Sequence, residues 1–341
     1  MLNVRRIVTA MASGPRGSRH SLSTWKGLLT LISAGFLFWG CGSPVIEQPG
    51  ASGRERITVV TAILPITLFS KAVAGDCAEV LSLTSNQDVH NYQARPADLL
   101  TLRRARVLVK NGLGIEGFLD KMIAASGNPK LTVVETSLGI STLATGSEPA
   151  SHHHDDHHHG PLDPHIWLDP QRAVQQVLTI RDSLVEADPS CAASYRRNAE
   201  DYVTRLRQLD RDLSTQLAPY RGRPVVMSHA FGAYFADRYA LKLEPLVDQP
   251  EQQPTPADLQ RVTKTVENAE LQAVLATPGE SGSLQALAND LSIPVLVFDP
   301  LETAAAAAAQ DPETYLTVMR GNAASVRSAF RASRRQASLK P

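Results

Sequence analysis

A single histidine, His165, lies between two prolines in residues 163–170, which read DPHIWLDP. Proline has no backbone N–H and restricts the residue before it, so we expect a stiff, non-helical loop here. A stiff loop suits a metal ligand, because a metal site must be held in its binding geometry in advance. One histidine in such a loop is more often structural, so the hypothesis of a metal site depends on ligands from other segments.

A second group of possible ligands precedes this loop, within a predicted loop at residues 146–162. Its members are imidazoles and carboxylates in one tract: His152, His153, His154, Asp155, Asp156, His157, His158 and His159. The segment holds almost nothing apolar, so it cannot offset its ordering entropy and should be mobile. A mobile tract cannot be the preorganised site. We expect it to bind additional metal weakly, the alternative being a tolerated low-complexity insertion.

Three further candidates follow predicted strands. His90, His229 and Asp299 each come shortly after an apolar, β-branched run. In open α/β sheets, the crevice beyond the carboxyl ends of the strands is where ligands bind. Any one of these residues alone is more often a helix cap or a satisfied polar group.

The histidine count strengthens the hypothesis. The chain has ten histidines: six lie in the tract, His20 lies near the N-terminus, and the other three are His90, His165 and His229. Three imidazoles and the carboxylate of Asp299 would complete a tetrahedral zinc shell. Nitrogen-rich sites favour zinc over manganese.

The chain after Arg56 alternates short β-branched runs with helical patterns, which is typical of βα units on parallel sheets. The expected strands are residues 57–62, 80–83, 105–109, 131–134, 224–228, 241–247, 271–276 and 294–298. The expected helices are residues 65–75, 96–104, 115–126, 170–188, 192–218, 231–239, 256–268, 282–291 and 311–332. The pattern predicts an α/β fold of two βα sandwich lobes, with four-stranded, mainly parallel sheets, joined by one long rigid backbone helix at about residues 190–218.

The predicted domains follow from this pattern. Residues 56–169 form the N-terminal lobe, residues 170–220 the connecting helices and residues 221–341 the C-terminal lobe. Cys77 and Cys191 fall in segments that the pattern places far apart. A disulfide between them is therefore not expected, although an oxidising compartment would allow one.

The N-terminus has the features of an export signal. Residues 1–40 combine five basic residues and no acid with a fourteen-residue apolar run, which is short for a membrane span. The run ends before Cys41, as in the lipobox of bacterial lipoproteins, although Trp39 stands where a small residue is preferred. We expect lipidation at Cys41 and a flexible tether over residues 41–55, the alternatives being plain secretion or an uncleaved anchor. Without residues 1–40 the chain has 29 basic and 34 acidic residues, which argues against a nucleic-acid partner.

Five segments resemble the signatures of the metal-specific solute-binding proteins of ABC importers, known as the cluster A-I family. They are HNYQARPAD (90–98), NGLGIEGFL (111–119), DPHIWLDP (163–170), SHAFGAYFADRYAL (228–241) and FDPL (298–301). The resemblance implies two βα lobes tied by a rigid helix, with His90, His165 and His229 as metal ligands. Asp299 matches the last carboxylate position, where zinc members can instead use water or a Glu from elsewhere. A histidine at 229 and a preceding His-rich loop are similar to the zinc branch.

The predicted function is capture of Zn²⁺ by an exported, monomeric receptor that delivers it to an ABC permease and is not an enzyme. The protein is expected in the periplasm or on the outer face of the cell membrane, with a lipid anchor. A manganese receptor of the same family is one alternative, and a surface metal buffer or adhesin is another. A zinc hydrolase with an open water position is a third, but the sequence has no HExxH motif and no obvious general base.

Other motif residues have structural interpretations. We expect Trp167 and Tyr92 to pack around the site, and Asn111 with Gly112 to form a strand-to-helix turn close to it. Asp98 is expected either to orient an imidazole or to cap a helix. The alanine run 304–309 favours a helical surface segment.

Overall fold

The computed structural model describes residues 55–84, 87, 89, 92–145, 162–249, 252–279 and 282–331. The predicted signal segment, Cys41, the tether up to residue 54, His90 and the tract from His152 to His159 lie outside these residues. All the described residues belong to one compact unit, residues 54–341. Within the described ranges, no helix combines the length and apolarity needed to cross a membrane.

The first half of this unit builds a parallel sheet. Its strands are β1 (Ile57–Thr61), β2 (Ala78–Ser82), β3 (Val107–Lys110) and β4 (Thr132–Glu135), in the order β2-β1-β3-β4. Its helices are α1 (Leu64–Ala74), α2 (Pro96–Arg104) and α3 (Leu119–Ser126). Val59 pairs with Val80 on one side and Val107 on the other, and all three are buried. The β-branched runs therefore form the interior of a sheet that is covered on both faces.

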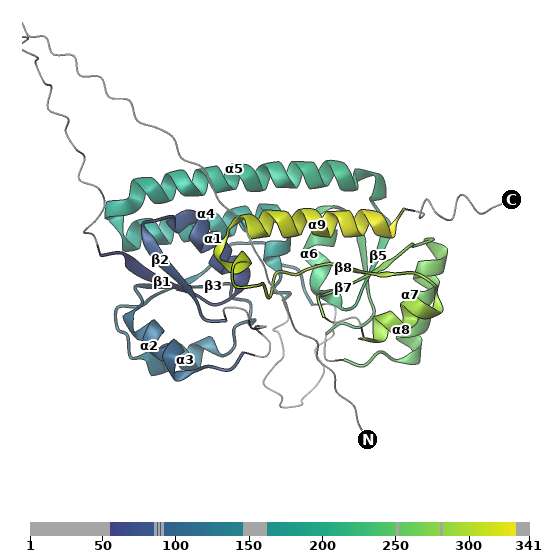
Figure 1. The fold of residues 1–341 in the computed structure, drawn as a ribbon, viewed down its shortest axis with the longest axis horizontal. Coiled ribbons are helices and arrows are strands. Elements are labelled where there is room, and N and C mark those ends of the chain that lie inside the picture. The colour runs from purple at the N-terminus through teal and green to yellow at the C-terminus, as the bar shows by residue number, and fades with distance from the viewer. Residues whose placement is uncertain are drawn as a thin grey trace, which may run out of the picture. The chain divides into compact units, whose positions relative to one another are not determined.

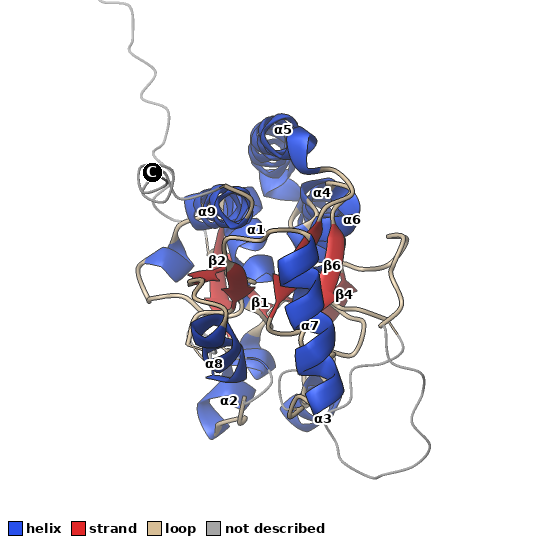
Figure 2. Ribbon diagram, turned by 90° about the vertical axis from the view of Figure 1, so that its right-hand side faces the viewer, coloured by secondary structure: helices blue, strands red, loops and turns tan. Residues whose placement is uncertain are grey.

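The second half repeats the same strand order. Its strands are β5 (Pro224–Met227), β6 (Lys242–Pro245), β7 (Val274–Ala276) and β8 (Val295–Val297), in the order β6-β5-β7-β8, again all parallel. Its helices are α6 (Ala233–Arg238), α7 (Pro256–Asn268), α8 (Gly282–Asp290) and α9 (Glu313–Ala329). The prediction of two four-stranded βα lobes is confirmed. Figure 2 shows α1, α4, α5 and α9 on one side of the strands and α2, α3 and α8 on the other.

Two helices connect the sheets: α4 (Pro170–Ala187) and α5 (Ala192–Leu217). The stripe Val203, Leu206, Leu209, Leu213 and Leu217 is buried along its whole length, as the three- and four-residue spacing predicts. Helix α5 has 26 residues, a length of about 39 Å, and it packs against α1, α4 and α9 (Figure 1). The long connecting helix thus contacts helices from both halves of the chain.

Cys77 and Cys191 form a disulfide, so the expectation that they lie far apart is wrong. Their Cα atoms are 6.2 Å apart although 114 residues separate them in the chain. Cys77 directly precedes β2, and Cys191 directly precedes α5. Because α5 packs against α1, the helix that leads into β2, the two segments meet.

Most predicted elements differ from the observed ones by a few residues at their ends, and three of the differences have a structural reason. Helix α3 begins at Leu119 and not at residue 115, because the Glu116 carboxylate accepts hydrogen bonds from the backbone N–H groups of Asn111 and Gly112, at 2.6 and 3.0 Å. Strand β7 begins at Val274 and not at residue 271, since the N–H of Gln272 donates to the carbonyl of Ala329 at the end of α9.

The alanine run is the third difference. Residues 304–309 form no α-helix, and the only regular element there is the 3₁₀-helix η6 (Ala308–Gln310). Alanine has high helix propensity, but a short run that buries little apolar surface is not held in a helix by propensity alone. Ala309 is nevertheless buried, and η6 packs against α1. The run is therefore a mostly exposed connection that is anchored at Ala309, and not an α-helical segment.

Candidate metal centre

His165 lies in a loop that leads through the 3₁₀-helix η2 (Ile166–Leu168) into α4, and it is buried. One oxygen of Asp163, Oδ1, accepts hydrogen bonds from the backbone N–H of His165 at 2.9 Å and from its Nδ1 at 2.7 Å. A carboxylate on one ring nitrogen fixes the tautomer and the orientation of an imidazole. Nε2 is therefore the nitrogen of His165 that can coordinate a metal.

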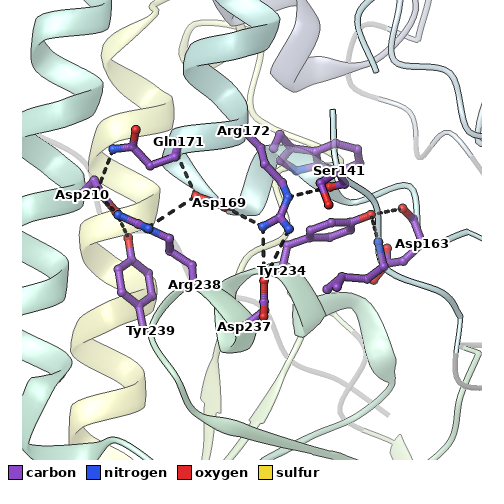
Figure 3. Close-up of polar contacts among 12 residues, drawn as sticks. Ser141, Asp163, Asp169, Gln171, Arg172, Asp210, Tyr234, Asp237, Arg238 and Tyr239 are labelled. Atoms are coloured by element: carbon purple, nitrogen blue, oxygen red, sulfur yellow. Dashed lines mark hydrogen bonds and ion pairs between the residues drawn. The ribbon is translucent and has the colours of Figure 1, made fainter. Parts of the chain in front are cut away.

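The two backbone carbonyls directly before His165 are also held. The Tyr234 hydroxyl, from α6, donates to the carbonyl of Asp163 at 2.8 Å and accepts from the N–H of Leu143 at 3.0 Å. The Asn111 side chain donates to the carbonyl of Pro164 at 3.0 Å. Figure 3 shows Tyr234 between Asp163 and the guanidinium of Arg172, which lies 4.7 Å from the ring centroid. Side chains from both halves of the chain thus fix the backbone around His165.

Glu302, which the sequence analysis missed, contacts the Nε2 edge of this imidazole. Nε2 of His165 lies 3.1 Å from Oε1 of Glu302, which follows β8 in the other half of the chain. Beside this contact, the Trp167 indole N–H donates to the carbonyl of Pro300 at 2.7 Å. Burial lowers the pKa of His165, but the charge and hydrogen bond of Asp163, together with Glu302, outweigh it and raise the pKa to about 10.

Two of the other predicted ligands, His229 and Asp299, come shortly after strands of the second lobe. His229 follows β5 by two residues and is buried, with its ring in edge contact with Phe231 at a centroid distance of 4.7 Å. Asp299 follows β8 by two residues, and its Oδ1 accepts from the N–H of Leu301 at 2.7 Å. Burial, with a smaller contribution from Glu302, raises the pKa of Asp299.

The four predicted ligands are not all among the described residues, because His90 lies outside them. In the described part of the chain, no three His, Cys, Asp or Glu side chains are grouped so that they could hold a metal ion by themselves. The described residues bring His165 together with Asp163 and Glu302. The ligand set of His90, His165, His229 and Asp299 stays a prediction.

The other motif residues have contacts that the structure describes. Trp167 and Tyr92 are buried, and the Tyr92 hydroxyl donates to Asp98 at 2.7 Å. Asp98 accepts a hydrogen bond from the N–H of Arg95 and so caps the first turn of α2. Of the roles expected for Asp98, this is the helix-capping one. Asn111 and Gly112 form the turn after β3. Gly112 has φ +92°, and a Cβ there would clash with the Glu135 side chain, so only glycine fits.

Comparison with known proteins places this fold and these motifs in a family. Residues 59–329 match the family "Zinc-uptake complex component A periplasmic". The chain is 26% identical over 304 residues to the high-affinity zinc uptake system protein ZnuA of Bacillus subtilis (strain 168), covering 87% of this chain and 95% of that protein. It is also 27% identical over 301 residues to the manganese-binding lipoprotein MntA of Halalkalibacterium halodurans, covering 86% of this chain and 93% of that protein.

A solved structure supports the same assignment. The crystal structure of a ZnuA deletion mutant with zinc bound matches with a TM-score of 0.70 and 26% identity, covering 82% of this chain and all of that one. The likeness extends over both lobes, since the family match runs from β1 to the end of α9. The chain therefore belongs to the zinc-uptake complex component A family of periplasmic metal-binding proteins.

Proposed function

We propose that this chain is an exported receptor that captures Zn²⁺ between its two lobes and delivers it to the permease of an ABC importer. The observation that carries the proposal is the arrangement at His165. Asp163 holds its Nδ1, and its Nε2 is directed at a carboxylate from the other lobe. The family membership and the zinc-uptake relative support a role in uptake.

The proposed zinc shell consists of His90, His165, His229 and one carboxylate, for which the sequence predicts Asp299. Imidazole nitrogen and carboxylate oxygen are the ligands of tetrahedral zinc sites. Three nitrogens favour zinc over manganese. Because one relative is named as a manganese-binding lipoprotein, manganese stays the alternative cargo.

The proposed mechanism is binding and release without turnover. Asp163 orients the imidazole of His165, while Tyr234 and Asn111 hold the loop that carries it. Ligands from both lobes on one ion would join the lobes at the site. A zinc hydrolase would instead need a coordination position kept open for water, and esterase activity of the purified zinc form would favour that alternative.

The location and partners are proposed from the N-terminal segment and the family. We infer export to the periplasm or to the outer face of the cell membrane, a lipid anchor at Cys41 and action as a monomer beside a membrane permease. One relative is a named lipoprotein, which supports the anchor. We also propose the domain limits predicted from the sequence. They are residues 56–169 for the N-terminal lobe, 170–220 for the connecting helices and 221–341 for the C-terminal lobe.

The decisive experiment is a metal analysis of full-length protein purified without an affinity tag, followed by competition between Zn²⁺ and Mn²⁺. One tight zinc equivalent that manganese in large excess does not displace is the expected result. Preferential binding of manganese would assign the chain to the alternative cargo. Absence of any tight equivalent would refute the receptor proposal.

A further inference from the structure

Basic side chains gather at the end of the first sheet where its parallel strands begin. We call this group the basic edge; its exposed members are Arg56, Arg103, Arg104, Arg106 and Lys130. Arg106 connects three strand starts, because its N–H donates to the carbonyl of Thr58 at 2.8 Å and its carbonyl accepts from the N–H of Thr132 at 3.1 Å. Its guanidinium also donates to the carbonyl of Lys130 at 3.1 Å. Cations from the starts of β1, β3 and β4 and from the end of α2 therefore adjoin one another.

The charges of the basic edge are not neutralised within the described part of the chain. There, Arg106 binds only the carbonyl of Lys130, and the other four side chains have neither an ion pair nor a hydrogen bond. Arginines in the last turn of a helix usually stabilise its free carbonyls. At the end of α2, however, Nδ2 of Asn128 already donates to the carbonyls of Leu102 and Ala105, at 2.9 and 2.8 Å. Capping of α2 therefore does not explain Arg103 and Arg104.

The surface around the basic edge is mainly of one sign. Between residues 99 and 119 the only acid is Glu116, which is buried. Asp120 is exposed in the first turn of α3, whereas Lys130 follows the last turn of that helix. The exposed carboxylates at the strand starts lie on the side of β1 and β2; they are Glu55, Asp76 and Glu79. The β3 and β4 side is thus suited to an anionic partner.

An exposed leucine extends this surface. Leu100 is 63% exposed and precedes Arg103 and Arg104 on α2 by three and four residues, so the three side chains share one face of the helix. An apolar side chain beside cations is typical of helices that lie on a membrane, where the apolar group enters the headgroup region. A small soluble anion would engage the cations alone.

The point at which the N-terminal segment joins the fold also favours a membrane. Strand β1 begins beside the basic edge, at the end of the first lobe that is remote from the second lobe (Figure 1). Fourteen positions separate Cys41, the proposed lipidation site, from Glu55. A flexible tether of that length spans about 20 Å on average. A lipid anchor at Cys41 would therefore hold the basic edge close to the membrane at high effective concentration.

We propose that the basic edge and Leu100 form a second membrane contact, which binds the headgroups of anionic phospholipids beside the lipid anchor. A tethered anchor fixes the point of attachment, whereas this contact would also fix the orientation of the first lobe. The inference rests on the proposed export and lipid anchor, and it is independent of which metal is the cargo.

The test measures how far a membrane covers Lys130 in the full-length chain. Protein purified in detergent is reconstituted with vesicles of neutral phosphatidylcholine, or with vesicles that also contain anionic phosphatidylglycerol. Mass spectrometry follows the acetylation of Lys130 relative to that of Lys242, which is exposed in the second lobe. Anionic vesicles should slow acetylation of Lys130 severalfold and leave Lys242 unchanged. Salt at about 0.5 M should remove the difference, because the Debye length is then only about 4 Å.

Matched double variants identify the side chains responsible. Arg103→Gln with Arg104→Gln removes two cations of the basic edge and should abolish most of the protection, since each basic residue strengthens binding to an anionic surface about fivefold. Arg196→Gln with Arg197→Gln removes an adjacent, exposed pair from α5 and should retain the protection. Thermal melting establishes that both variants are folded.

The other outcomes separate this contact from the anchor. Equal acetylation of Lys130 on both kinds of vesicle, with the chain sedimenting with both, would refute the contact and leave the anchor standing. Wild-type protection in the Arg103 and Arg104 variant would also refute it. Sedimentation with anionic vesicles alone would support the contact and refute the anchor, and sedimentation with neither would refute both. If soluble polyphosphate protected Lys130 as well as anionic vesicles do, the partner would be a soluble polyanion and not a membrane.

Discussion

At the residue scale, His165 and Asp163 form a unit in which a carboxylate fixes an imidazole. One carboxylate oxygen accepts both the backbone N–H and the ring nitrogen of a residue only two positions away. The ring of His165 therefore cannot turn without losing its hydrogen bond to Asp163 in a buried environment. An imidazole held in this way loses little conformational freedom on binding a metal, which favours high affinity.

Removal of the proposed ligands is the first prediction. Zinc affinity should fall on the order of tenfold or more in each of His90→Ala, His165→Ala and His229→Ala. Even mutation of a residue that only contacts a metal ligand lowers metal affinity about 10- to 100-fold. Asp299→Ala should cost less. Chelator competition in a background without residues 151–159 measures the effect without the tract. Unchanged affinity of His165→Ala in that background would show that the central assignment is wrong.

Proton linkage is the second prediction. The pKa of His165 is raised to about 10, so the metal-free protein carries a proton there at neutral pH that zinc must displace. Proton release makes affinity increase with pH. His90 and His229 would also have to be neutral to coordinate zinc, which adds to the loss of affinity at low pH. Zinc titrations from pH 5 to pH 8 measure the slope, and a flat profile would exclude three histidine ligands.

The sequence predicts part of this residue-scale arrangement. His165 can be identified because the prolines on either side of it are local features of the chain. Glu302 cannot, because its contact with His165 joins residues 137 positions apart and depends on how the two lobes pack. The role of Asp163 depends on the loop conformation, which brings its side chain back to the residue two positions ahead.

At the element scale, a buried ionic cluster joins α4, α5 and α6. Asp210, in the middle of α5, accepts from Nε of Arg238 at 2.7 Å and from Nε2 of Gln171 at 2.8 Å (Figure 3). Arg238 belongs to α6, and Gln171 to the first turn of α4. The carboxylate thus connects the long helix to a helix of the second lobe and to the helix that follows the His165 loop.

Neutralising Asp210 is the third prediction. Asp210→Asn should destabilise the metal-free protein by about 1–3 kcal/mol, because Arg238 loses a charged partner while remaining partly exposed to solvent. Urea unfolding measures the change, and Asp201→Asn, at an exposed position on the same helix, is the control. Equal stability of the two variants would show that the cluster contributes little.

The sequence predicts the elements better than it predicts this cluster. The spacing of apolar residues locates the buried stripe of α5 and both of its ends to within two residues. Asp210, however, is one of many charged residues on that helix. Its neighbours in the sequence do not distinguish it from Asp201, which is exposed. Its burial results from the packing of α6. The Cys77–Cys191 disulfide was missed for the same reason, since it depends on the contact of α5 with α1.

At the scale of the whole molecule, side chains from both lobes contact the loop of His165. The described residues on either side of the His-rich segment lie beside that loop. Ala144 pairs with Leu162 in an isolated antiparallel bridge, and the N–H of Asp163 donates to the carbonyl of Leu143 at 2.9 Å. The described residues that flank positions 146–161 on both sides are therefore held next to Asp163.

Deletion of the tract is the fourth prediction. Removing Ser151 to His159 should abolish weak zinc equivalents in calorimetry and leave one tight equivalent, because six imidazoles raise the local metal concentration without forming the preorganised site. Growth under zinc limitation should slow only mildly. Loss of the tight equivalent would make the tract the primary site, and the assignment of His90, His165 and His229 would have to be withdrawn.

The Cys77–Cys191 disulfide closes a covalent ring that contains β2, β3, β4, the His-rich tract, His165 and α4. A protease that cuts once anywhere between residues 78 and 190 would open this ring without dividing the molecule. The nicked protein should migrate as one species on a denaturing gel without reductant and as two fragments after reduction. An envelope protease could therefore cut the chain beside the proposed site while both fragments stay attached to the same receptor. Two fragments on the non-reducing gel would show that the ring is open in the purified protein.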